Sequence, residues 1–239
     1  MVELERRDGR KPERVAAPLR QQVVALISEA VAAGDYPPGN RLIERELCDR
    51  FEVSRTVIRE ALRHLEAQGL IVIVANRGPV VATVTAEEAV GIYEVRGALE
   101  GLAAECFAAR ATHEEKDRIA VAVDNVERVT RHGDMRALLR AKDQFYDILL
   151  EGAHNPIIMS LLRTLHARIR VLRSLSLSAS GRGEQTASEL RAIVTAIGDG
   201  NSDRAARLMV RHVQNAAAAA LAQLAERNAD QADQEPGVA

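Results

Sequence analysis

The segment from residue 86 to residue 226 constrains the fold most, because every periodic stretch in it has the spacing of a helix. Apolar residues recur three and four positions apart, and no stretch alternates with the period of two that indicates a strand. The pattern breaks at Gly133, Asn155-Pro156, 180–183 and 199–201. These breaks predict helices at 86–110, 113–132, 134–152, 155–176, 184–200 and 202–227. Residues 85–227 are therefore expected to form an all-α helical bundle.

The preceding segment, residues 18–84, combines helices with a hairpin. Helical stripes cover residues 18–33, 43–51 and 54–68. The second stripe is expected to point Ile43, Leu47 and Phe51 inward. Two β-branched runs follow, joined by the turn-forming sequence Ala-Asn-Arg-Gly at 75–78. The predicted fold class is thus mainly α, with an N-terminal winged helix-turn-helix (three helices plus a β-hairpin) ahead of the bundle.

The rest of the sequence limits the classes of partner. Polar residues 1–17 and 228–239 predict a flexible N-terminal arm and a disordered tail. The 32 Lys and Arg against 34 Asp and Glu give a net charge of −2, so a nucleic-acid surface has to be local. With no signal peptide, no run of about 18 apolar residues and two distant cysteines, we expect a cytoplasmic protein with no membrane partner.

The third predicted helix has the pattern of a recognition helix. One face carries the apolar residues Ile58, Ala61, Leu62 and Leu65, and another carries Arg55, Arg59 and Arg63. Thr56 lies beside Arg55 at the N-terminal end, which usually meets base edges in this motif. A guanidinium can pair with guanine as a fork, which discriminates by about 1–3 kcal/mol. A solvated helix face would show the same stripe, but the order of elements around it favours DNA binding.

Other residues of this half are candidates for contacts to the DNA backbone. Arg45, at the start of the second helix, can reach a phosphate, as can Ser54 and the backbone N–H groups at the start of the third. Arg77 and Gly78 at the hairpin tip would allow a wing to approach the DNA closely.

The segment PPGNRLIERELCDRFEVSRTVIREALRHLEAQGLIVIVANRGPVVATV resembles the DNA-binding domain of GntR-type bacterial transcription regulators. The resemblance rests on PG-x-R-L, E-L, V-S-R-T-x-x-R-E-A-L, L-x-x-x-G-L and N-R-G. It implies a homodimer on a pseudo-palindromic double-stranded operator. The DNA contacts that it implies are Arg45, Ser54, Arg55, Thr56, Arg59 and Gly78.

Residues 86–222 resemble the C-terminal domain of the FadR-like subfamily, through IYEVRGALEGLAAECFAARAT, FYDILLEGAHNPII and AIGDGNSDRAARLMVRHV. This resemblance implies a helical bundle with a small-molecule pocket and a dimer interface. Many members of the subfamily bind a divalent metal through one Asp and three His. The corresponding positions here are Lys142, Tyr146, Leu190 and His212. Only the last keeps a ligand, so we expect no metal cofactor.

Helical phase separates two faces of the predicted helix at 134–152. The stripe expected to face the bundle consists of Leu138, Lys142, Phe145, Leu149 and Gly152. The opposite stripe has charges of alternating sign and includes Asp143 and Asp147, which we therefore expect at the surface. Lys142 could snorkel to the edge of the bundle or pair with a carboxylate, and the other alternative is that it lines a pocket. In a pocket Arg96, Lys142, Tyr146 and His212 would hold an anionic effector, with the lysine charge in place of the metal.

The function that these features predict is a dimeric, ligand-responsive transcription regulator, with repression as the expected mode. Two alternatives remain: a regulator whose bundle only dimerises, and a metal-dependent sensor with a rearranged site. An enzyme is not expected, because the sequence has no nucleophile elbow, phosphate-cradling glycine loop, HExxH motif or paired inward carboxylates.

Overall fold

The computed structural model describes residues 19–234, which form two compact units that divide between Thr83 and Val84. The predicted arm at 1–17 and the last five residues of the predicted tail lie outside the described range. No helix within that range is long and apolar enough to cross a membrane. The predicted fold class is confirmed, because within residues 19–234 three helices and a hairpin precede six further helices.

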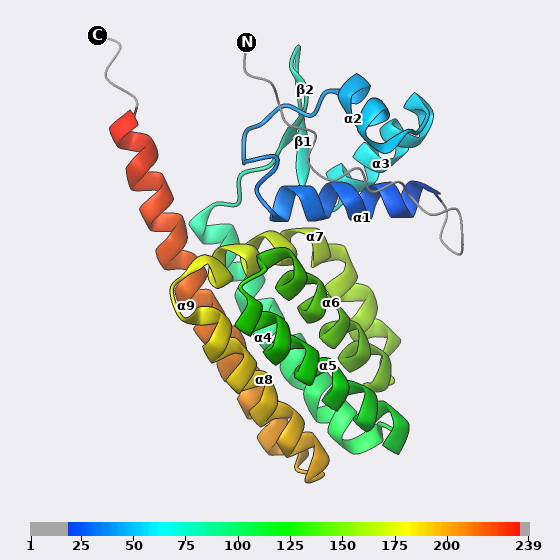
Figure 1. Ribbon diagram of the computed structural model, residues 1–239, viewed down its shortest axis with the longest axis vertical. Helices are drawn as coiled ribbons and strands as arrows, with labels where there is room; N and C mark the ends of the chain where they lie inside the picture. The colour runs from blue at the N-terminus through cyan, green and yellow to red at the C-terminus, as the bar shows by residue number, and fades with distance from the viewer. Residues whose placement is uncertain (1–18, 235–239) are drawn as a thin grey trace. The chain divides into compact units, whose positions relative to one another are not determined.

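The first unit contains three helices and one antiparallel hairpin, coloured blue to cyan in Figure 1. Its elements are α1 (Leu19–Ala32), α2 (Glu44–Phe51), α3 (Arg55–Ala67), β1 (Ile71–Val74) and β2 (Gly78–Val81). Ile71 pairs with Val81 and Val74 with Gly78. Val23, Ile27, Leu47, Ile58 and Leu65 are among the residues that fill its core.

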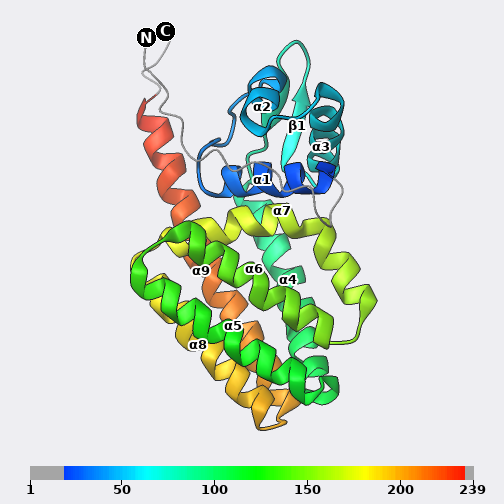
Figure 2. The ribbon, with the colours of Figure 1, turned by 45° about the vertical axis from the view of Figure 1, so that its right-hand side comes forward.

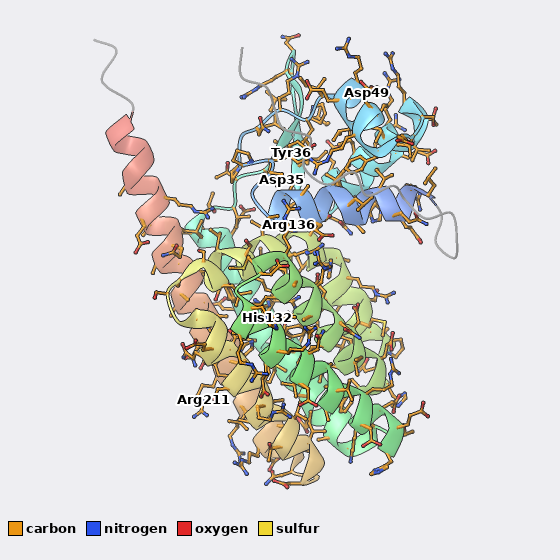
Figure 3. The ribbon with its side chains drawn as sticks, in the orientation of Figure 1. Asp35, Tyr36, Asp49, His132, Arg136 and Arg211 are labelled. Carbon is orange, nitrogen blue, oxygen red and sulfur yellow. The ribbon has the colours of Figure 1, made fainter. Side chains whose placement is uncertain are left out.

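Ile43 was predicted to point inward, and this prediction is wrong. The residue is the N-cap of α2, has extended backbone angles and is 41% exposed. Since it lies just outside the helix, the helical phase that buries Leu47 and Phe51 does not extend to it. Polar bonds then fix the loop before α2: Arg50 donates to the Tyr36 hydroxyl at 2.9 Å and to Asp35 at 3.0 Å. Figure 3 labels Asp35 and Tyr36, which lie side by side.

The second unit is a bundle whose helices begin and end close to the sequence breaks. They are α4 (Ala86–Arg110), α5 (His113–His132), α6 (Met135–Gly152), α7 (Pro156–Ser178), α8 (Arg182–Gly198) and α9 (Ser202–Gln234). Capping boxes start α4 at Thr85 and α5 at Thr112, and Asn155 caps α7. Gly133 ends α5 in the left-handed conformation, with φ of 69°.

Helices α4 and α9 form the most extensive helix pair of the bundle and lie side by side in Figures 1 and 2. The prediction that a disordered tail begins at residue 228 is wrong up to residue 234. Helix α9 continues to Gln234, because neither glycine nor proline occurs in that stretch and the first such residue is Pro236.

Two helices end in glycine, and only one of these glycines is closely packed. A Cβ on Gly152, the last residue of α6, would lie 2.3 Å from Phe107 Cε2, and Phe107 itself is fully buried. Gly198, the last residue of α8, has nothing within 4 Å of the same position. Because Gly152 has no side chain, the end of α6 can lie directly against Phe107 of α4.

We predict that Gly152→Ala lowers the free energy of unfolding by about 1–3 kcal/mol, because a methyl group there overpacks the Phe107 ring. Gly198→Ala is the matched control, and it should raise the same free energy by about 0.4–1 kcal/mol through the unfolded state. Urea denaturation followed by circular dichroism measures both. Equal effects of the two substitutions would contradict this account of the packing.

Candidate DNA-binding surface and effector site

Helix α3 is divided into a buried and an exposed face. Ile58, Ala61, Leu62 and Leu65 are at most 4% exposed and pack into the first unit. The four polar side chains predicted to read DNA all lie on the exposed side, namely Arg55, Thr56, Arg59 and Arg63. The side-chain oxygen of Ser54 accepts a bond from Val57 N at 3.4 Å and so starts the helix. The N-terminal turn of α3 is therefore open to a partner.

Two further candidates have partners within the protein. Arg59 Nε lies 3.0 Å from both carboxylate oxygens of Glu44, although its side chain is 63% exposed. Arg77 donates to the Gly39 carbonyl at 3.0 Å and so ties the hairpin to the loop before α2. Gly78 has φ of 83°, a conformation that favours glycine. Arg45 is exposed on the first turn of α2.

In the second unit the four predicted effector residues, Arg96, Lys142, Tyr146 and His212, all lie inside the bundle, at most 3% exposed. They come from α4, α6 and α9. Next to them the structure places further polar residues that sequence reasoning missed. We call the whole set the interior polar cluster: Arg96, Glu100, Lys142, Asp143, Tyr146, Arg170, Arg173, Arg182, Thr186, Glu189 and His212.

On α4, Arg96 and Glu100 form a fully buried pair. Arg96 Nε lies 2.8 Å from Oε1 and Nη2 lies 3.2 Å from Oε2 of Glu100. Burial would raise the pKa of Glu100, but Arg96 outweighs it and holds that pKa below its ordinary value. The guanidinium also lies 5.0 Å from the centre of the Tyr93 ring.

On α7, two arginines share one carboxylate. Arg173 donates to Asp143 Oδ1 at 2.9 Å, and Arg170 Nε lies 3.1 Å from Oδ2. Arg173 also lies over the Tyr146 ring at 3.8 Å. The prediction that Asp143 is a surface residue is therefore wrong, because α7 covers that edge of α6 and leaves the side chain 17% exposed. Asp147 is exposed, as predicted.

On α8 and α9, Glu189 connects three partners. It lies 2.5 Å from His212 Nδ1 and 3.0 Å from Arg182, and it accepts from Asn215 at 2.7 Å. Burial would raise the pKa of Glu189, but the His212 bond and the other partners lower it to about 2. Burial lowers the pKa of His212 to about 4, helped by Lys142 and Arg182, although Glu189 opposes the shift. His212 is thus neutral at pH 7.

Lys142 is the cation of the cluster that forms no ion pair with the described residues. Its side chain is 2% exposed, so the alternative that it snorkels to the edge of the bundle is excluded. Burial lowers its pKa well below the ordinary value, and Arg173, Arg96 and Arg182 lower it further, while Glu100 opposes them. Burial raises the pKa of the neighbouring Tyr146, and Glu100 adds to that rise.

The donors at this site do not suit a divalent metal. Within residues 19–234 no three His, Cys, Asp or Glu side chains are grouped as a metal would require. A metal at His212 Nε2 would face the cationic side chains Lys142 and Arg182, which act on the same ring. Such neighbours repel a cation and suit an anion.

Comparison with known proteins agrees with both units. Residues 19–81 match the family described as bacterial regulatory proteins, gntR family, and residues 91–215 match the FCD domain. A probable D-xylose utilization operon transcriptional repressor of Paenarthrobacter nicotinovorans is 30% identical over 194 residues, 80% of this chain and 84% of that protein. The galactonate operon transcriptional repressor of Escherichia coli is 27% identical, covering 77% and 89%.

Solved structures show the same fold. A putative transcriptional regulator GntR from Rhodococcus sp. RHA1 superimposes with a TM-score of 0.73 at 25% identity, covering 85% of this chain and 97% of that one. E. coli McbR/YncC gives a TM-score of 0.77 at 19% identity, covering 87% and 99%. The Rhodococcus protein and the two repressors are described as regulators rather than enzymes, in agreement with the sequence prediction. The chain belongs to the gntR family of bacterial regulatory proteins and carries an FCD domain.

Proposed function

We propose that this transcription regulator is a dimeric repressor, and that a small anionic metabolite bound in its FCD domain changes its affinity for operator DNA. The observation that carries this proposal is the charge of the interior polar cluster. Four arginines and Lys142 lie there at most 6% exposed, against the three carboxylates Glu100, Asp143 and Glu189. An operator-binding protein of this kind works in the bacterial cytoplasm.

Unpaired hydrogen-bonding atoms in the cluster support the same reading. The buried atoms of the cluster that form no hydrogen bond with the described residues include Arg96 Nη1, Arg182 Nε, Arg182 Nη1, Thr186 Oγ1 and His212 Nε2. Each such atom costs about 1–3 kcal/mol if it stays unpaired. A bound carboxylate would accept from the guanidinium groups and offset the excess positive charge. A bundle that served only for dimerisation would have no need of this interior.

Regulation requires that the metabolite bind two states of the protein with different affinity. The cluster joins α4, α6, α7, α8 and α9, so a ligand that neutralises its charges changes how strongly these helices hold together. The named relatives support repression as the mode: the Paenarthrobacter and E. coli proteins are called repressors of a D-xylose utilization and a galactonate operon.

An apolar groove between α4 and α9 supports dimerisation. It measures about 410 Å³ and is lined mainly by small and apolar residues, among them Val90, Gly97, Ala98, Val210 and Leu221. Val90 is 42% exposed, and Leu102, one turn beyond Ala98 on the same helix, is 43% exposed. We propose that a second copy of the chain covers this face, as a two-fold symmetric operator requires.

The DNA-reading role of α3 predicts different effects for two arginines. Arg55→Ala should weaken binding to an operator, selected from random DNA by repeated rounds of binding, by about 1–3 kcal/mol through loss of base contacts. Arg45→Ala should weaken binding to all DNA sequences alike. It should also reduce the slope of log affinity against log salt concentration by about one, the loss of one phosphate contact. Fluorescence anisotropy at several salt concentrations measures both.

Arg207→Ala, an exposed arginine of α9, is the control for these substitutions and should leave operator affinity unchanged. The selected operator should be a pseudo-palindrome. If the Arg55→Ala variant bound the operator with wild-type affinity, α3 would be excluded as the helix that contacts the bases.

The charge of Lys142 predicts a pH dependence of effector binding. The lysine has a lowered pKa in the empty protein, and a bound anion raises it, so binding takes up a proton. Affinity for L-malate should therefore fall as pH rises above that lowered pKa, by at most about tenfold per pH unit. Isothermal titration in buffers of different ionisation enthalpy counts the protons.

Lys142→Met should remove both the proton uptake and most of the affinity, while keeping the fold, because methionine fills the same space without a buried charge. Lys116→Met, on α5 outside the cluster, is the matched control. Tight, pH-independent anion binding by Lys142→Met would overturn the assignment of the lysine.

The groove predicts that Ala98→Arg abolishes the dimer, because a guanidinium would be buried against an apolar partner face. Sedimentation equilibrium should give the monomer mass, and affinity for a two-site operator should fall with it. Val121→Arg, on α5 outside the groove and 65% exposed in the wild type, should remain dimeric. A dimeric Ala98→Arg protein would place the interface elsewhere.

A further inference from the structure

His212 has an unusual hydrogen-bonding state for a buried histidine. Its Nδ1 lies 2.5 Å from a carboxylate oxygen of Glu189, and a carboxylate only accepts hydrogen bonds. Nδ1 must therefore carry the proton. In the neutral ring Nε2 is then left with a lone pair and no hydrogen, and it can only accept.

No described residue donates to that lone pair. His212 is 1% exposed, and its Nε2 has no partner in the described part of the chain. The ring is fixed by its place on α9: Arg211, the preceding residue, lies outside the bundle in Figure 3, whereas His212 points in. The site thus holds one acceptor among several unpaired donors.

A simple carboxylate leaves the acceptor of the neutral His212 ring unpaired. Its oxygens would accept from Arg96 Nη1 and from the two free nitrogens of Arg182, which are all donors. Against His212 Nε2, however, the same oxygens would place one lone pair against another. A ligand that pairs with the whole set needs an acceptor group with negative charge and, close to it, a hydrogen-bond donor.

Resting on the anionic effector proposed above, we propose that the effector is a hydroxy acid. Its carboxylate accepts from the guanidinium groups of Arg96 and Arg182 and lies near Lys142, and a hydroxyl on a neighbouring carbon donates to His212 Nε2. Thr186, one helical turn after Arg182 on α8, has an unpaired hydroxyl that can donate or accept towards a further ligand hydroxyl. Polyhydroxy acids therefore fit the site as well as simple hydroxy acids.

This hydroxyl should decide specificity. An analogue without the hydroxyl leaves His212 Nε2 as a buried, unpaired acceptor. It should bind much more weakly, because any bond from Nε2 to water is lost and no bond to the ligand replaces it. If a retained water molecule donated to Nε2 instead, the two analogues would bind alike.

Matched pairs of acids test the proposal on the full-length wild-type protein. Glycolate is compared with acetate, L-lactate with propionate, L-malate with succinate, and D-gluconate with hexanoate, by thermal shift and isothermal titration. For each pair that binds, we expect the hydroxy acid to have a dissociation constant at least about tenfold lower. Equal affinity within the pairs would overturn the hydroxy-acid inference but leave the anionic effector standing. Absence of stabilisation by any acid would overturn the anionic effector itself.

A variant and a spectroscopic measurement address His212 directly. His212→Phe should lose the discrimination within each pair while still binding the operator. His132→Phe, an exposed histidine of α5 labelled in Figure 3, should keep the discrimination. Independently of whether His212→Phe folds, ¹⁵N-histidine NMR of the wild type should show His212 as the Nδ1–H tautomer, with the Nε2 resonance moving when the hydroxy acid binds. An Nε2–H tautomer in the free protein would overturn the proposal.

Discussion

The arrangement of the FCD domain depends on keeping five cationic side chains inside a helical bundle. An unpaired buried charge is costly, so each must find a carboxylate, lose its proton or wait for a ligand. The four arginines take the first course: Arg96 and Arg182 each pair with a glutamate of their own helix, and Arg170 and Arg173 share Asp143. The pairs with Asp143 link α7 to α6, and the bonds of Glu189 to His212 and Asn215 link α8 to α9, so the polar interior also sets how these helices meet.

The sequence predicted the helices well because residues close to each helix end determine where the helix begins or stops. Capping residues, Gly133 and Asn155-Pro156 act within one turn, and the structure begins and ends α4 and α5 where the breaks fall. The same holds for α3, whose amphipathic pattern assigns Ile58 and Arg55 to opposite faces. The end of α9 was missed because polar residues predict disorder, although nothing in them breaks a helix.

The interior polar cluster was only half predicted, and the reason is geometric. Arg96, Lys142 and His212 were found from their inward phase or their place in a family pattern. Arg173 and Arg182 were not singled out from the sequence, because a helix taken alone does not show which neighbour covers it. The prediction that Asp143 is exposed was wrong for the same reason, since α7 buries this side chain and the sequence of α6 alone does not show it. Apolar neighbours of Arg173, such as Leu172 and Leu175, were the available signal.

The choice of lysine at position 142 also follows from this constraint. The chain has only three lysines among its 32 basic residues, yet one of them occupies the buried position without an ion pair. A guanidinium there would keep its charge at every physiological pH, whereas an amine can give up its proton. A neutral amine lets the empty bundle avoid an uncompensated buried charge, and the same amine recovers its charge when an anion arrives. Lysine thus suits a site that has to be stable both empty and filled, which a permanent cation or a bound metal would not allow in these surroundings.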